Sequence, residues 1–482
     1  MTKNTETGAK PIDKERDRVR QVRDDISGWR KWGPYLSDRA WGTVREDYSD
    51  NGDAWNFVTY DKARAKAYRW GEDGIAGISD RYQLLCFAPT FWNERDPHLK
   101  ERLYGLNPNE GNHGEDVKDY YFHVDNTPTH SYMCLLYKYP QHEFPYRWLV
   151  EENQRRAGQG PEFELIDTGI FDDNRYFDVF IEYAKQTHED ISIRITAHNR
   201  GPDAAPLHII PTLWFRNTWA WGKNPKPEPS IQKDISDGQT LALLADDGDM
   251  PPDRNMPPHY SLGMRWLIGP AEGAVLVTDN ETHGERAYGP GNSSRKPYTK
   301  DAFHRAVCEG DGGAVKPGPN EAGTKAALHY KYMVPAGGSV TLRLRFTDGK
   351  KREALHEVDA IVDQRKAEAD IFYAAIAPKT ASVDEKLVQR RAFAGLLWTK
   401  QSYLFDVGKW FDGDNPDFPP PKSRHRIRNS HWRHLNTMRV MSMPDKWEYP
   451  WFAAWDLAFH CIPLAELDPE FAKAQLLLLT RE

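Results

Sequence analysis

The stretch DISIRITAHN, residues 190–199, decides the fold of the first part of this chain. Its Ile193 and Ile195 alternate with polar residues, and this period of two predicts a β-strand with one buried and one solvated face. Similar β-rich runs recur between turn signals at 119–125, 176–184, 273–280 and 339–346. Short strands at such spacing are typical of an antiparallel β-sandwich, which we expect over residues 27–347.

The hydrophobic period changes after Asp348-Gly349, from two to about three and a half. Apolar residues on one side of the expected helix are Leu355, Val358, Val362 and Phe372. The helix is expected to end near Pro378, because proline disfavours continuation of a helix. We therefore assign residues 348–380 to a linker helix.

Two further helices are predicted from their start signals. Ser382, with Glu385 three residues on, forms a capping box. The face this helix buries is expected to hold Leu387, Ala394, Leu397 and Trp398. Asp468 as N-cap and Pro469 at the first helical position predict the last helix. Its inward positions are Phe471, Gln475 and Leu478.

Charge and hydropathy exclude several classes of protein. The 482 residues contain 64 Lys+Arg against 71 Asp+Glu, and no basic run is dense enough to follow a phosphate backbone, so a nucleic-acid partner is not expected. No signal peptide and no long apolar segment is apparent. We expect a cytoplasmic protein without a membrane partner, whose charged residues 1–26 form an exposed helix or arm.

Cysteine and aromatic content give two more expectations. Cys86, Cys134, Cys308 and Cys461 lack CxxC spacing, which favours free thiols over a zinc site or disulfides. The chain holds 17 Trp, 22 Tyr and 20 Phe, and several tryptophans adjoin polar residues, as in WFRNTWAWG at 214–222. Such amphipathic surfaces suit a sugar, whose C–H faces stack on rings while its hydroxyls need polar partners.

One carboxylate stands out in EYPWFAAWDLAFH, residues 448–460. Asp456 could be the N-cap of a short buried helix. It could instead be a general acid, because a carboxyl group surrounded by Trp451, Phe452 and Trp455 would be desolvated, which favours its protonated form. A helix N-terminus would oppose that shift, so the two interpretations compete.

Three other polar motifs are weaker candidates. The segment at 111–130 contains His113, Glu115, Asp116, His123 and His130, but their spacing matches no metal-ligand motif, so a polar loop leading into a strand is favoured. His431 and His434 could share a helical face or lie on a loop. WGEDG, residues 70–74, is most simply a turn.

The stretch YPWFAAWDLAFH resembles the acid-bearing segment of glycoside hydrolase family 63. The matching positions are Tyr449, Pro450, Trp455, Asp456, Phe459 and His460. The resemblance extends from about Trp29 onward, through YRWGEDGIAGISD, ERLYGL, GNHGEDVKDYYFHVDNTPTHSY, LIDTGIFDDNRYFDVFIEYAK and PTLWFRNTW. Several long motifs in the expected order make it specific.

This resemblance implies an N-terminal β-sandwich packed on an (α/α)6 toroid, with hydrolysis that inverts the anomeric centre. Asp456 takes the role of general acid, and a second carboxylate roughly 6.5–9.5 Å away activates water. That base belongs to a later toroid helix, so residues 381–482 would be only the start of the catalytic domain. We expect the chain alone to be inactive, with an apolar face exposed.

The resemblance also bears on the substrate, expected to be an α-linked oligosaccharide or a small glycoside. Trp451 stands where the eukaryotic enzymes have arginine, so the same oligosaccharide specificity does not follow. Expected sugar contacts are Lys446, Trp447, Glu448, Trp451 and Trp455. The alternative for Trp447 and Trp451 is toroid core. The loop GNHGEDVKDYY could roof the pocket.

No cofactor is implied, and no metal-ligand set is assigned. Two alternatives to an inverting α-glucosidase stay open. One is a non-catalytic carbohydrate-binding protein whose sandwich holds the sugar. The other is a different six-hairpin hydrolase, trehalase-like or glucoamylase-like, with the same fold and different pocket walls.

Overall fold

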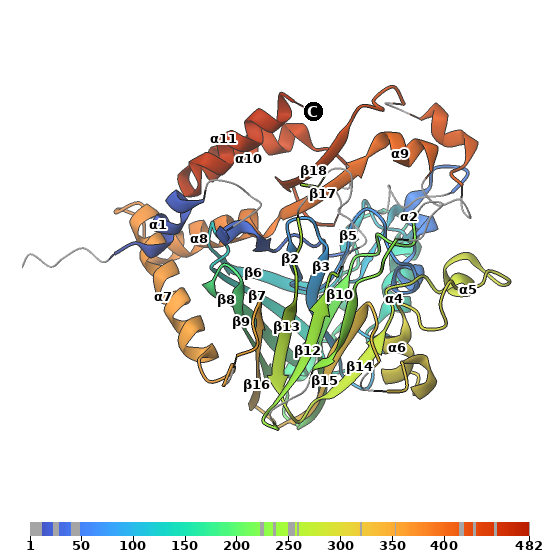
Figure 1. Cartoon of the computed structure of the whole chain (residues 1–482), viewed down its shortest axis with the longest axis horizontal. Helices are drawn as coiled ribbons and strands as arrows, with labels where there is room; N and C mark the ends of the chain where they lie inside the picture. The colour runs from blue at the N-terminus through green and yellow to red at the C-terminus, as the bar shows by residue number, and fades with distance from the viewer. Residues whose placement is uncertain are drawn as a thin grey trace, which may run out of the picture.

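Two antiparallel sheets face each other at the centre of the molecule, with helices around them (Figure 1). The computed structural model describes residues 12–22, 28–39, 49–221, 226–234, 238–248, 256–257, 260–318, 321–351, 353–413, 419–427, 430–447 and 451–481. The six-stranded sheet has the order β1 (Trp32–Gly33), β2 (Ile78–Asp80), β3 (Leu85–Trp92), β10 (Ala205–Phe215), β15 (Lys325–Val334), β14 (Ala274–Thr278). The eight-stranded sheet has the order β11 (Ser230–Asp234), β12 (Thr240–Asp246), β13 (Arg265–Pro270), β16 (Ser339–Thr347), β9 (Asp190–Asn199), β8 (Tyr176–Thr187), β7 (Tyr132–Pro140), β6 (Tyr120–Asn126).

Strand β9 confirms the prediction made from its period of two. Ile193 and Ile195 are fully buried, whereas Arg194 is only partly buried. Ile195 lies opposite Ile181 of β8 and Leu342 of β16. The inward side chains of both sheets form one continuous hydrophobic core, as expected when two sheets pack face to face.

Strands β3 and β10 were not predicted, because each carries proline inside an otherwise central strand. The structure accommodates the prolines in the middle of these strands by placing Pro89 directly opposite Pro211, whereas Pro206 is the second residue of β10. Pro89 lies beyond the part of β3 that pairs with β2, and Pro211 falls in a gap in the pairing of β10 with β15. Neither position therefore needs the N–H that proline lacks.

The three predicted long helices are α7 (Val358–Ile376), α8 (Val383–Trp398) and α11 (Pro469–Leu479). The capping box of α8 is confirmed by hydrogen bonds in both directions between Ser382 and Glu385, at 2.7 and 3.2 Å. The Asp468 carboxylate accepts from the Phe471 N–H at 3.1 Å, as expected of an N-cap. The prediction for Leu387 was wrong: this side chain is 48% exposed, whereas Leu397 is buried.

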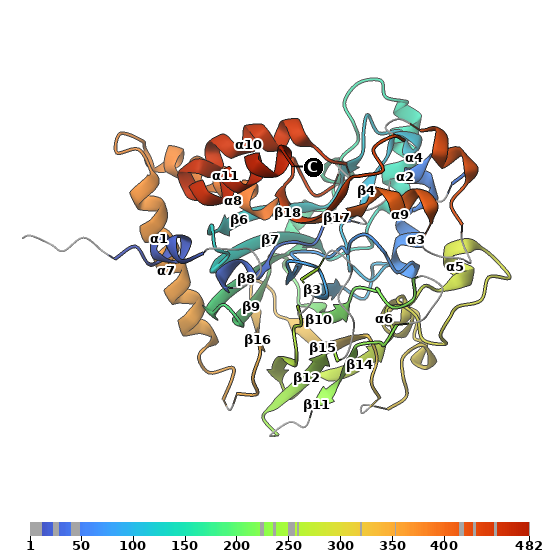
Figure 2. The same ribbon diagram turned by 45° about the horizontal axis from the view of Figure 1, so that its top comes forward.

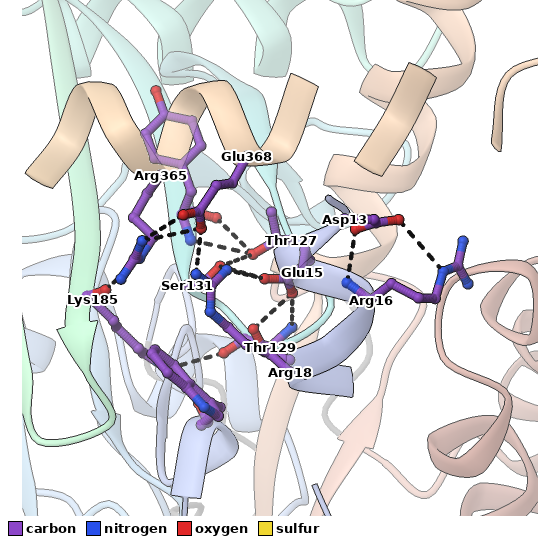
Figure 3. Close-up of polar contacts among 12 residues, drawn as sticks. Asp13, Glu15, Arg16, Arg18, Thr127, Thr129, Ser131, Lys185, Arg365 and Glu368 are labelled. Atoms are coloured by element: carbon purple, nitrogen blue, oxygen red, sulfur yellow. Dashed lines mark hydrogen bonds and ion pairs between the residues drawn. The ribbon is translucent and has the colours of Figure 1, made fainter. Parts of the chain in front are cut away.

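The described part of the charged N-terminal segment, residues 12–22, contains a helix, as expected, but this helix is not fully exposed. Helix α1 (Lys14–Gln21) lies against α7 and the turn between β6 and β7, and Figure 3 shows its polar contacts. The fully buried Glu15 carboxylate accepts from the Thr129 N–H at 2.9 Å and from the Ser131 hydroxyl at 2.5 Å. Arg18 pairs with Glu15 and with Glu368 of α7. A charged helix can thus be buried when each charge has a partner.

The C-terminal part combines helices with a small sheet. Strands β17 (Lys400–Asp406) and β18 (Asn436–Ser442) pair with each other, and α10 (Ala454–Leu467) packs along α11 (Figure 2). The helical part in the described residues is not a closed ring, so the (α/α)6 toroid stays a prediction, as does the domain division.

The remaining helices and strands are α2 (Ala54–Phe57), α3 (Tyr60–Ala65), α4 (Tyr146–Arg156), α5 (Gly284–Tyr288), α6 (Ala302–Val307), α9 (Val407–Asp412), β4 (Gly105–Leu106) and β5 (Asp116–Val117).

Two sequence-based expectations concern the whole chain. The four cysteines are free thiols, and all except the partly buried Cys308 are buried. Among the helices that the structure describes, none is long and apolar enough to cross a membrane.

Candidate active site

Asp456 lies in the first turn of α10, as the third residue of the helix. The N-cap is Ala453, which supplies no side-chain hydrogen bond, so the interpretation of Asp456 as an N-cap is wrong. The half-buried carboxylate nevertheless lies at the end of the helix where the backbone dipole favours negative charge.

The β17–β18 pair positions the helix that carries Asp456. Ala453 and Leu457, on the inner side of α10, pack in one hydrophobic cluster with Tyr403 of β17 and Met441 of β18. A second cluster joins the later part of α10 to α7, α8 and α11. Buried apolar contacts therefore hold both the first turn of α10, through β17 and β18, and its later part, through the other helices.

His460 lies one helical turn after Asp456, on the same side of α10. Its Nδ1 is 2.9 Å from the Ser442 hydroxyl at the end of β18. Burial lowers the pKa of His460 below its usual value, although the nearby Asp456 carboxylate acts in the opposite direction. A largely neutral imidazole next to a carboxylate can hold or pass a proton, which is the chemistry of general acid–base groups.

The aromatic residues around Asp456 do not enclose it as we expected. Trp455 is 76% exposed and Trp451 is 49% exposed. Phe452 packs instead against Tyr403, with ring centroids 5.9 Å apart. The desolvated pocket inferred from the sequence is therefore absent from the described residues around this carboxylate.

Large apolar side chains cover the outer side of α10 and α11. On α10 they follow helical spacing and include Phe459, 60% exposed, and Ile462, 71% exposed. The rings of Trp455 and Phe459 lie 6.3 Å apart. We call these exposed residues the apolar stripe: Trp455, Phe459, Ile462, Leu476 and Leu477.

Lys446 lies at the contact between the N-terminal segment and the loop after β18. Its buried ammonium donates to the Pro34 carbonyl and lies 6.0 Å from the Trp398 ring centroid. Burial lowers the pKa of Lys446 to about 8, although the Asp38 carboxylate opposes that shift. Burial raises the pKa of Asp38 to about 6, against the effect of Lys446 and of a hydrogen bond from Tyr121. The ammonium is thus engaged inside the protein and not on an open surface.

Trp447 is buried in the main core of the sandwich. Its ring lies so close to Gly105 that a Cβ there would come within 2.2 Å of it. The Arg39 guanidinium lies 4.6 Å from the Trp447 ring and 3.6 Å from the Trp55 ring. Trp447 is therefore a core residue, as the alternative to a sugar contact expected. The core to which it belongs is that of the sandwich and not that of a toroid. Glu448, with Tyr449 and Pro450, lies outside the described residues.

The histidines of the segment at 111–130 do not meet at a common point. His113 contacts Glu162 at 2.7 Å, His123 stacks on Trp398 at 5.6 Å, and His130 contacts Asn126 at 3.0 Å. The favoured polar-loop interpretation fits these separate contacts. His431 and His434 are exposed in a turn and not on a helix.

Three carboxylates do lie close together, those of Asp116, Glu162 and Glu164. The Lys118 ammonium lies among them, at 2.9 Å from Glu162 and 2.8 Å from Glu164. An ammonium in this place supplies the positive charge that a metal ion would otherwise bring. The group is therefore a satisfied ion cluster.

Sequence reasoning missed a buried ion cluster formed by WGEDG, residues 70–74. Glu72 and Asp73 are buried, and Asp73 accepts from Arg102 Nε at 3.1 Å. Glu72, Asp73 and Lys300 line a small cavity of about 20 Å³. Burial raises the pKa of Glu72, and it lowers the pKa of Lys300 to about 8. The only signal in the sequence was a pair of acids beside tryptophan, because the basic partners come from distant segments.

Comparison with known proteins gives one close relative of unknown activity. No protein-family model matches the chain. The Saccharomyces cerevisiae protein named uncharacterized protein YMR196W is 44% identical over 514 aligned residues. The alignment covers 97% of this chain and 46% of the yeast protein, so the chain spans about half the length of that relative.

Two solved structures are distantly similar. One is named as a kojibiose phosphorylase from the human microbiome, with 10% identity, 49% of this chain and 25% of that chain covered, and a TM-score of 0.16. The other is the family GH92 inverting mannosidase of Bacteroides thetaiotaomicron, with 9% identity, coverage of 69% and 38%, and a TM-score of 0.23. Similarity at this level defines neither the fold nor the activity of this chain.

Proposed function

We propose that this chain belongs to an inverting glycoside hydrolase of the family 63 type, acting on α-glucosides or related α-glycosides, with Asp456 as general acid. The observation that carries the proposal is the motif geometry: Asp456 occupies the first turn of α10, and His460 of the same motif lies one turn on, fixed by Ser442. An acid on a rigid helix end keeps its orientation toward a glycosidic oxygen.

The apolar stripe supports a second part of the proposal. Several large exposed apolar side chains on two neighbouring helices are typical of a surface that another segment covers. The yeast relative has about as much sequence again outside the region matched here. We propose that further helical sequence of this kind covers the stripe and supplies the general base, roughly 6.5–9.5 Å from Asp456.

The partner implied by this proposal is a neutral carbohydrate, and neither nucleic acid nor a membrane is needed. Trp451 and Trp455 have exposed rings beside the acid, on which a sugar ring could stack. Lys446 and Trp447 are buried, so the proposal does not use them as direct sugar contacts, and Glu448 lies outside the described residues. A cytoplasmic location remains part of the proposal.

The test compares the 482-residue chain with the longest open reading frame that contains it, on a panel of α-glucosides. The longer protein is expected to be active and the 482-residue chain inactive. Asp456→Asn in the longer protein should lower turnover by about 10²-fold or more while sugar binding persists. Glu466→Gln, an exposed acid on the same helix, is the matched control and should leave turnover unchanged. Full turnover in Asp456→Asn would remove this residue from the mechanism.

A further inference from the structure

A cavity of about 210 Å³ lies on the sandwich beside α5, at the end of β10. Figures 1 and 2 both show α5 on the opposite flank of the sandwich from α7. The residues of the cavity that matter here are Trp221, Tyr288, Glu281, Thr282, Ser294 and Arg295. Trp221 belongs to the tryptophan-rich motif at 214–222, which the proposed active site does not use.

One wall of the cavity is aromatic. The Trp221 Nε1–H donates to the Asn217 carbonyl at 2.9 Å, so the indole has no polar hydrogen left for the cavity. What Trp221 offers to a ligand is therefore carbon surface. The ring of Tyr288, on α5, also lines the cavity. Such rings stack against the C–H face of a sugar.

The other wall is polar and already ordered. The Glu281 side chain, 3% exposed, accepts from the Trp219 indole at 2.8 Å and from Arg295 Nε at 3.1 Å. These bonds hold an acceptor and a donor side by side. That arrangement suits neighbouring hydroxyls, each of which can donate and accept.

Two hydroxyls add donors to this wall. Thr282 Oγ1 accepts from the Ala67 N–H at 3.0 Å, and Ser294 Oγ accepts from the Gly284 N–H at 3.0 Å. Within the part of the chain that the structure describes, neither hydroxyl donates a hydrogen bond. Both O–H groups can therefore donate to a ligand.

Charge and size limit the ligand. The Arg295 guanidinium is paired with the carboxylates of Glu281 and Glu228, so it is not a free cation for an anionic ligand, and the Glu281 carboxylate is not free for a metal ion. The volume lies below the roughly 300–1,000 Å³ of sites for drug-sized ligands. A single neutral ring with several hydroxyls fits these conditions.

We propose that this cavity is a second carbohydrate site, which binds one neutral monosaccharide unit by stacking on Trp221 and Tyr288 and by hydrogen bonds to Glu281, Arg295 and the two hydroxyls. The site is separate from Asp456, and its existence does not depend on the proposed hydrolase activity. In an enzyme that acts on a glycan, it would hold a second part of the carbohydrate on the sandwich.

The test is saturation-transfer NMR on the full 482-residue chain with glucose, mannose and galactose, and with glucose 6-phosphate as the anionic comparison. At least one neutral sugar should give ring-proton signals. Trp221→Ala and Tyr288→Ala should each weaken its binding by about tenfold or more, as truncation of a central aromatic contact does. Tyr288→Ala is included because the more buried Trp221 contributes to packing.

The matched control is Trp148→Ala, on α4, whose ring is 50% exposed and lies outside the cavity. This variant should bind the sugar as the parent chain does. The proposal is overturned if no neutral sugar binds, if glucose 6-phosphate binds as tightly, or if folded Tyr288→Ala keeps full affinity.

Discussion

Removing the charge of Asp468 should loosen the helix pair that carries Asp456. Asp468 is fully buried between α10 and α11, and its carboxylate has two functions. It caps α11 through the Phe471 N–H, and it forms a buried ion pair with Arg30 of the N-terminal segment. The Arg30 guanidinium also lies 5.5 Å from the Phe471 ring. This ion pair ties α10–α11 to the sandwich.

Two substitutions separate these functions. Asp468→Asn keeps a good capping group but removes the Asp468 carboxylate from its ion pair with the buried Arg30, and breaking such a buried pair costs about 3–5 kcal/mol. Asp468→Ala also removes the cap, adding about 1 kcal/mol. Glu470→Ala is the matched control, because its pair with Lys473 is exposed on the same helix and is worth less than about 1 kcal/mol.

Hydrogen exchange followed by mass spectrometry measures the effect locally, on peptides from α10 and α11, so that two-state unfolding of the whole chain is not required. Exchange in these peptides should accelerate strongly in Asp468→Asn, somewhat more in Asp468→Ala, and hardly at all in Glu470→Ala. Equal protection in Asp468→Asn and Glu470→Ala would refute the role assigned to the ion pair.

Three further predictions concern the stability of the fold. Ser382→Ala should lower the free energy of unfolding by about 1 kcal/mol in urea titrations, because the capping box of α8 is lost; Lys386→Ala, on the same helix, should change it little. Gly105→Ala should lower the free energy of unfolding by about 1–3 kcal/mol, because the new Cβ would meet the Trp447 ring. Gly114→Ala has open space around it and should be tolerated; thermal melts of the two variants check this difference. Burial lowers the pKa of Lys185 from 10.5 to about 7, so the unfolded chain binds more protons between these values and stability should rise with pH across that window. Lys185→Gln should reduce this rise in urea midpoints measured at pH 7 and pH 9.5; an unchanged rise would contradict it.

The part of the fold that the sequence predicts is the part governed by local patterns. The alternation in β9 and the start signals at Ser382 and Asp468 lie within a few residues of the structure that they specify. Strands β3 and β10 were not predicted, because the positions where their prolines are tolerated depend on pairing between residues far apart in the chain.

The candidate site follows the same division. The motif around Asp456 could be found from its order of residues, but its surroundings could not. Lys446 looked like a surface contact, yet its partners Pro34 and Asp38 come from the other end of the chain. Trp447 belongs to the sandwich core because Gly105 leaves room for its ring. Long-range burial of this kind has no local signal in a single sequence.

The docking of α1 on α7 also sets an order of events during synthesis. Arg18 and Glu368 are 350 residues apart in sequence. At roughly 5–20 residues per second, about 18–70 s pass on the ribosome between the two. Throughout that interval Arg18 lacks its Glu368 partner, and a charged helix can stay in water without aggregating. Helix α1 can therefore complete its contacts only after the linker helix α7 has been made.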